Sequence, residues 1–114
     1  MSDILTLKEN REFRRAYNKG RSFVSPVLVT YVIKNNYSNL RIGITTGKKI
    51  GKAYMRNRSR RIIRAALYEI YPDIKKGHDL VFVARGKTPF VKSGDILQSM
   101  KKHLREAGLL EKSL

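Results

Sequence analysis

Residues 40–70 read LRIGITTGKKIGKAYMRNRSRRIIRAALYEI, and the spacing of the apolar residues changes within this stretch. In the first seven residues the apolar side chains alternate with others, which is typical of a half-buried strand. After Gly47 they recur every three or four positions from Met55 to Ile70, which predicts an amphipathic helix of about four or five turns. A strand followed by a long helix is therefore the centre of the expected fold.

A first helix is expected near the N-terminus. Thr6 and Glu9 have the spacing of a capping box, which places the start of the helix near Leu7. Gly20 is suited to end it, because glycine is the commonest residue just after a helix. We therefore expect a helix of about three turns before the first strand.

Short apolar runs between turn residues predict the strands. Residues 27–33 are almost all apolar or β-branched, and the polar loop 35–39 joins them to the strand at 40–46. These two strands are expected to pair antiparallel, as in a hairpin. Residues 80–84 predict another buried strand, and a further short strand is expected around 21–24.

A last helix completes the predicted order. It follows Pro89 and Ser93, ends at Gly108, and carries one apolar face. The expected fold class is α+β, a single-domain α/β sandwich with a small mixed sheet and helices on at least one face. The order is α-β-β(-β)-α-β-α over residues 1–114, and the apolar face of the last helix consists of Ile96, Leu97, Met100 and Leu104.

The composition points to a polyanionic partner. The chain has 114 residues, with 25 Lys and Arg against 9 Asp and Glu, and a formal net charge of +16. A folded domain with this excess usually binds nucleic acid, because the charge opposes compaction. The absence of Cys excludes disulfides and thiolate metal sites. No apolar run approaches the ~20 residues of a membrane span, and no signal peptide is recognised, so we expect a cytoplasmic protein without a membrane partner.

The strongest basic signal lies within residues 48–64, which hold eight basic residues and no acidic one. Arginine suits phosphate because its planar fork can bind two oxygens at once. The alternative is a solvated helix face, but such faces normally intersperse Glu among the cations. At 100° per residue, the side opposite the apolar stripe is expected to carry Asn57, Arg58, Arg60, Arg61 and Arg64, with Arg56 at its border.

Catalytic and nucleotide-binding motifs are not recognised. Gly47 and Gly51 stand too close together for a Walker loop, which also needs Ser or Thr after its Lys. His78 and His103 lack a metal-ligand spacing and are expected at the surface. Asp79, beside a strand, is expected to be a turn or salt-bridge residue rather than a base. If the protein takes part in a reaction on nucleic acid, another component is expected to do the chemistry.

Three aromatic residues leave two interpretations open. Phe13 and Tyr17 lie one helical turn apart, and Tyr31 lies on the strand at 27–33. Aromatic rings beside basic residues can stack on unpaired bases. The alternative is that all three are core residues, which the periodicity alone favours.

The motif order resembles a known family. Arg41-Ile42-Gly43-Ile44, Lys48-Lys49-Ile50-Gly51-Lys52-Ala53 and Arg56-Asn57-Arg58-Ser59-Arg60-Arg61 together resemble the signature of the bacterial ribonuclease P protein subunit. The resemblance implies a small α/β sandwich with a left-handed crossover around the arginine-rich helix. It also implies a large catalytic RNA as partner and precursor tRNA as substrate, whose 5′ leader is removed. The RNA subunit is then expected to need Mg²⁺ and to carry out hydrolysis, with no catalytic residue, metal or cofactor on the protein.

The resemblance also assigns site residues by position. The arginine helix is expected to bind the catalytic RNA, and a cleft is expected to bind the single-stranded leader. A ribosomal or ribosome-assembly protein and a basic DNA-binding protein are the alternatives, although neither needs this motif run. The residues for the RNA subunit are Arg56, Asn57, Arg58, Arg60, Arg61 and Arg64, and those for the leader cleft are Phe13, Tyr17, Tyr31, Lys48, Lys49 and Lys52.

Overall fold

The computed structural model describes residues 4–111 and contains one five-stranded mixed sheet in the order β1-β4-β5-β3-β2. Three α-helices and three short 3₁₀ turns accompany the strands, which confirms the expected α+β class. The strands are β1 (Leu5–Thr6), β2 (Arg21–Val24), β3 (Leu28–Lys34), β4 (Arg41–Thr45) and β5 (His78–Ala84). The helices are α1 (Asn10–Lys19), α2 (Ala53–Ile70) and α3 (Ser93–Glu106), and the 3₁₀ turns are η1 (Lys48–Ile50), η2 (Tyr71–Asp73) and η3 (Thr88–Phe90).

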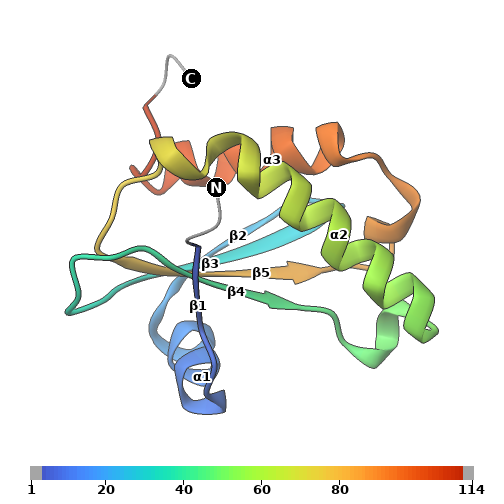
Figure 1. Ribbon diagram of the computed structural model, residues 1–114, viewed down its shortest axis with the longest axis horizontal. Helices are drawn as coiled ribbons and strands as arrows, with labels where there is room; N and C mark the ends of the chain where they lie inside the picture. Colours follow the sequence, from blue (N-terminus) through green and yellow to red (C-terminus); the bar gives the residue numbers. More distant parts are fainter. Residues whose placement is uncertain (1–3, 112–114) are drawn as a thin grey trace.

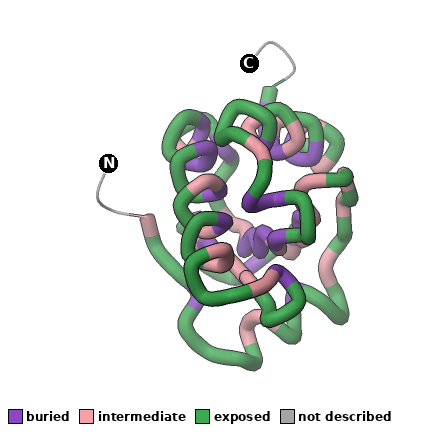
Figure 2. The backbone as a smooth tube through the Cα atoms, turned by 90° about the vertical axis from the view of Figure 1, so that its right-hand side faces the viewer, coloured by how far each residue is buried: buried purple, intermediate pink, exposed green. Residues whose placement is uncertain are grey.

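The helices lie on both faces of the sheet. Figure 1 shows α2 and α3 side by side on one face and α1 alone on the other. The main core lies under α2 and α3, where Ile63, Phe82 and Met100 are fully buried. A smaller cluster under α1 includes Ala16 and Val81. In Figure 2 the buried residues lie between the layers and the exposed ones on the outside.

The expected hairpin between the strands at 27–33 and 40–46 is wrong. β5 lies between β3 and β4, antiparallel to β3 and parallel to β4. The loop 35–39 opens around Gly77, whose carbonyl accepts from the Asn35 N–H at 2.9 Å and whose N–H donates to Asn39 O at 3.1 Å. The backbone groups of both loop ends therefore bond to Gly77, just before β5, and the Asn35 side-chain amide also joins the two ends by donating to Asn39 O at 3.2 Å. The β4–α2–β5 connection is the crossover around the arginine-rich helix.

The start of the first helix also differs from the expectation. Thr6 belongs to β1, which pairs parallel with β4, and α1 begins only at Asn10. The capping box consists of Glu9 and Glu12. One Glu12 carboxylate oxygen accepts from the backbone N–H groups of Glu9 at 2.9 Å and Lys8 at 3.0 Å. These bonds lower the pKa of Glu12 and end β1 after two residues.

Asp79 forms the salt bridge expected of it. Arg41 donates to both Asp79 carboxylate oxygens at 2.8 and 2.7 Å and to Glu12 at 2.7 Å. The hydrogen bonds to Asp79 raise the pKa of the Arg41 guanidinium above its ordinary value. The cluster joins α1, β4 and β5 at one end of the sheet, which fixes the position of α1.

The surface position expected for His103 is wrong, because its side chain is 1% exposed between α3 and the sheet. Its Nδ1 lies 2.8 Å from the Thr30 hydroxyl, and burial lowers the pKa of the imidazole. Its position falls on the apolar face of α3, beside Met100 and Leu104. His78 is half-buried, with Nδ1 3.0 Å from Lys76 O. In the described part of the chain, no helix is long and apolar enough to span a membrane.

Candidate nucleic-acid interface

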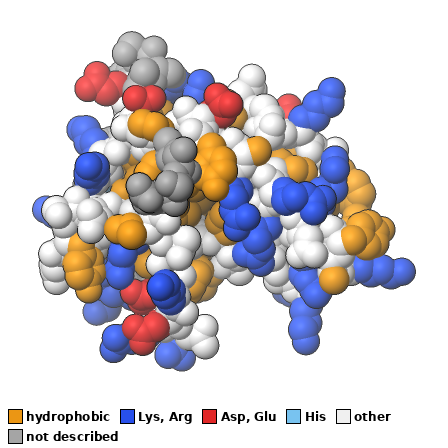
Figure 3. Space-filling view, in the orientation of Figure 1, with side chains coloured by type: hydrophobic (Ala, Val, Ile, Leu, Met, Phe, Trp, Pro, Cys, Tyr) orange, Lys and Arg blue, Asp and Glu red, His pale blue; other side chains and the backbone are white. Residues whose placement is uncertain are grey.

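The N-terminal half of α2 carries an uncompensated positive charge. Its first turn has no acidic residue, and its N-cap, Lys52, makes no side-chain capping bond. Cations near a helix N-terminus oppose the helix dipole, typically by ~0.3–1 kcal/mol each. In Figure 3 blue Lys and Arg side chains dominate the right-hand part of the surface, where Figure 1 places this half of α2. An anion bound here would interact favourably with the helix dipole and would reduce the mutual repulsion of the arginines.

The arginines of α2 point in three directions. Arg61 and Arg64 are exposed, as is Asn57, and none of their side chains has a hydrogen-bond partner within residues 4–111. Arg58 is exposed but held, because its Nε donates to Pro89 O at 2.6 Å. Arg56 is half-buried and donates to Gly51 O at 3.1 Å, which agrees with its expected border position.

Arg60 does not lie opposite the apolar stripe as expected. It is half-buried over β4, where it donates to Ile44 O at 3.2 Å and to the Thr46 hydroxyl at 2.8 Å. The fully buried residues of α2 centre on Ile63, and Arg60 lies three positions earlier, only 60° from that centre. The sequence periodicity correctly predicted an apolar stripe on α2 but centred it too close to Ile62, which placed Arg60 on the opposite side of the helix.

A groove lies between α1 and β4, with an open volume of about 520 Å³. Phe13 and Tyr17 line it from α1, Thr45 from β4, and Arg60 from α2. The Tyr17 hydroxyl lies 2.7 Å from the Thr45 hydroxyl, which fixes the ring across the groove. The groove therefore combines aromatic rings, hydroxyl groups and cations, the combination that binds single-stranded nucleic acid.

The structure separates the residues expected in the leader cleft. Tyr17 is 36% exposed in the groove, whereas Tyr31 lies beneath it, edge to face at 5.0 Å between ring centroids. Phe13 is half-buried and packs against Gly43, where an added Cβ would lie 2.5 Å from the Phe13 ring. Phe13 and Tyr31 thus also belong to the smaller core cluster.

The three lysines assigned to the cleft rim lie apart from the groove lining. Lys48 and Lys49 belong to η1, and Lys52 precedes α2. All three are exposed beyond the C-terminal end of β4, on the approach to the arginine helix (Figure 1). They extend the basic surface of α2 rather than line the aromatic groove.

One contribution to the interface was missed from the sequence. Thr45 and Thr46 line the groove and fix Tyr17 and Arg60 through their hydroxyl groups. Two adjacent threonines at the end of a strand are too common to indicate a site by themselves. Only the approach of α1 and α2 to the same end of β4 reveals their role.

Comparison with known proteins identifies the family. The family model for Ribonuclease P matches residues 1–108. The ribonuclease P protein component of Oceanobacillus iheyensis is 42% identical over 106 residues, covering 92% of this chain and 88% of that protein. The corresponding protein of Clostridioides difficile is 43% identical over 97 residues, covering 83% and 84%.

Solved structures agree with the sequence relatives. The RNase P protein of Staphylococcus aureus has a TM-score of 0.82 and 28% identity, and covers 96% of this chain and 100% of that one. The RNase P protein of Thermotoga maritima has a TM-score of 0.77 and 27% identity, with coverage of 89% and 96%. The fold, the arginine helix and these relatives lead to one conclusion. The chain belongs to the ribonuclease P protein family, the protein subunit of the enzyme that matures the 5′ end of tRNA.

Proposed function

We propose that this chain is the non-catalytic subunit of ribonuclease P, and that it binds both the catalytic RNA and the 5′ leader of precursor tRNA. The arginine face of α2 carries the proposal. Arg58 and Arg61 are exposed on one helix whose first turn holds no acidic residue. Neighbouring guanidinium groups on one helix fit the phosphates of a folded RNA.

The side chains at the arginine face and at the groove suggest a different RNA ligand for each surface. The arginine face offers cations for the backbone of the catalytic RNA. The groove of Phe13 and Tyr17 offers rings for unpaired bases of the leader. We assign the Mg²⁺-dependent hydrolysis to the RNA subunit.

Cleavage of precursor tRNA by reconstituted enzyme tests the proposal. The protein alone should cleave nothing, and together with its RNA it should raise cleavage most at low Mg²⁺. Protein cations then replace part of the divalent ions that hold two polyanions together. Arg61→Gln should weaken this enhancement, whereas Lys76→Gln, which removes the same charge before β5, should not. Leader removal by the purified protein without RNA would refute the assignment.

A further inference from the structure

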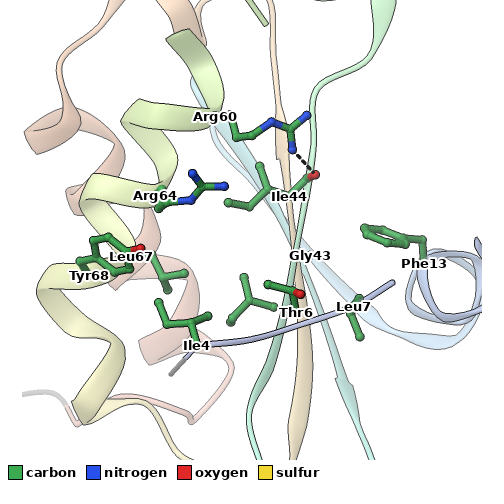
Figure 4. A pocket seen from close by; sticks show the side chains of 11 residues that line it. Ile4, Thr6, Leu7, Phe13, Gly43, Ile44, Arg60, Arg64, Leu67 and Tyr68 are labelled. Carbon is green, nitrogen blue, oxygen red and sulfur yellow. Dashed lines mark hydrogen bonds between the residues drawn. The ribbon is translucent and has the colours of Figure 1, made fainter. Parts of the chain in front are cut away.

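A second hollow lies beside the groove, on the other side of Arg60. Its volume is about 430 Å³, at the lower end of the ~300–1,000 Å³ typical of small-molecule sites. β1 has two residues and β4 has five, so β1 pairs with only part of the outer edge of β4. Along the rest of that edge α2 and not a strand lies beside β4, and the hollow remains between them. Figure 4 shows its walls, which are Ile4 and Thr6 from the N-terminal segment, Ile42 and Ile44 from β4, and Leu67 and Tyr68 from α2.

Among the described residues, the charged side chains that line this pocket are all of one sign. Arg60 and Arg64 line it, and no carboxylate of residues 4–111 does. Arg60 is fixed by its bonds to Ile44 O and Thr46. Arg64 has no hydrogen-bond or ion-pair partner among residues 4–111, and in Figure 4 its guanidinium extends over the pocket toward Ile44. Apolar walls under two arginines suit a ligand with a flat apolar part and an attached anion.

The pocket continues the groove. Phe13, Ile44 and Arg60 line both hollows, so a strand in the groove can reach the pocket by passing Arg60. A nucleotide combines a flat base with a phosphate, which matches the apolar walls and the two arginines. Tyr68, which is 46% exposed at the pocket, offers a ring for stacking.

We propose that this pocket binds the base of one unpaired nucleotide of the RNA strand that occupies the groove, with the phosphate of that nucleotide on Arg64 and Arg60. The inference rests on the proposed assignment of the groove to the leader. It adds a site for a single base beyond the groove that contains Tyr17. The affinity for precursor tRNA should therefore increase in two steps as the leader becomes longer, first when the groove is filled and then when the pocket is filled.

The test uses the reconstituted enzyme and precursor tRNAs whose leaders shorten one nucleotide at a time. Affinity should rise as the groove fills and rise again, roughly ten-fold, at the length that supplies the pocket nucleotide, a gain in the range expected for one stacked base. Tyr68→Ala and the pocket-filling Thr6→Trp should remove only the second step, and Tyr68→Phe should keep it. Tyr54→Ala is the matched control, because Tyr54 is an exposed tyrosine of the same helix that does not line the pocket.

The outcomes separate this inference from the proposed function. If affinity does not depend on the leader at all, the proposed groove function fails together with the pocket. If affinity rises in a single step with leader length, and neither Tyr68→Ala nor Thr6→Trp changes that step, only the pocket inference fails. A second step that survives an abasic nucleotide at that position also overturns it, because the base is then not bound. If micromolar free nucleoside monophosphate abolishes the second rise in affinity, the pocket is a site for free nucleotides and the inference about the RNA strand is overturned.

Discussion

Replacing Tyr17 with alanine separates the two interpretations of the groove aromatics. The substitution removes a hydrogen bond to Thr45, worth about 0.5–1.5 kcal/mol, and an edge contact with Tyr31 of similar size. Because Tyr17 is 36% exposed, the free energy of unfolding should fall by about 1–3 kcal/mol, less than the ~3–5 kcal/mol of a buried aromatic. Loss of one stacked base should cost a further ~1–3 kcal/mol of precursor binding, or about 5- to 150-fold in Kd.

The assay compares precursor and mature tRNA on the same assembled enzyme. Tyr17→Ala should raise the Kd for precursor tRNA and leave that for mature tRNA unchanged, because only the precursor carries a leader. Tyr17→Phe keeps the ring and loses only the bond to Thr45, so it should bind both forms almost like the unaltered protein. A large drop in Tm together with equal losses for both tRNAs would refute the reasoning and make Tyr17 a packing residue.

Three further predictions concern docking, stability and pH. Arg61→Ala should weaken binding to the catalytic RNA without lowering Tm, and in a salt titration the slope of log K against log salt should fall by about one, the contribution of one phosphate contact. Asp79→Asn should lower the free energy of unfolding, measured by urea denaturation, by about 1.5–3 kcal/mol, because Arg41 loses its charge-assisted bonds to Asp79 and keeps only the pair with Glu12, while the exposed Asp73→Asn should change little. The lowered pKa of His103 means that the unfolded chain takes up a proton more readily, so stability is full above about pH 6.5 and falls as pH drops below it, by at most about 1.4 kcal/mol per pH unit. His103→Gln should flatten this slope between pH 5 and 6.5, and an unchanged slope would assign the pH dependence to other groups.

Local patterns in the sequence predicted the elements well. The apolar stripe of α2 gave a helix that the structure places at Ala53–Ile70, and the short strand expected around residues 21–24 is β2. Both depend on spacing over a few turns or a few residues, which the sequence displays directly. The position of Asp79 beside a strand likewise indicated a turn or salt-bridge residue, and the structure shows that its partner is Arg41.

Non-local pairing was beyond the sequence pattern. A polar loop between two apolar runs is typical of a hairpin, and nothing local shows that Gly77 opens the loop 35–39. Similarly, helical periodicity predicted the apolar stripe of α2, but it did not predict that Arg60 donates to Ile44 O of β4. That bond depends on where α2 crosses the sheet. The bond of His103 to Thr30 is also non-local, because the two residues are 73 positions apart, although the helical spacing already places His103 on the apolar face of α3.

The groove and the pocket have a common structural cause in the early end of β1. The carboxylate of Glu12 takes the backbone N–H groups of Lys8 and Glu9, so these residues cannot extend the ladder along β4. An uncovered strand edge is usually a liability, and here Arg60 covers it by donating to Ile44 O. Because a side chain covers less of that edge than a strand would, hollows remain on both sides of Arg60. The bonds that begin α1 thus also leave open the edge of β4 on which the proposed RNA contacts depend.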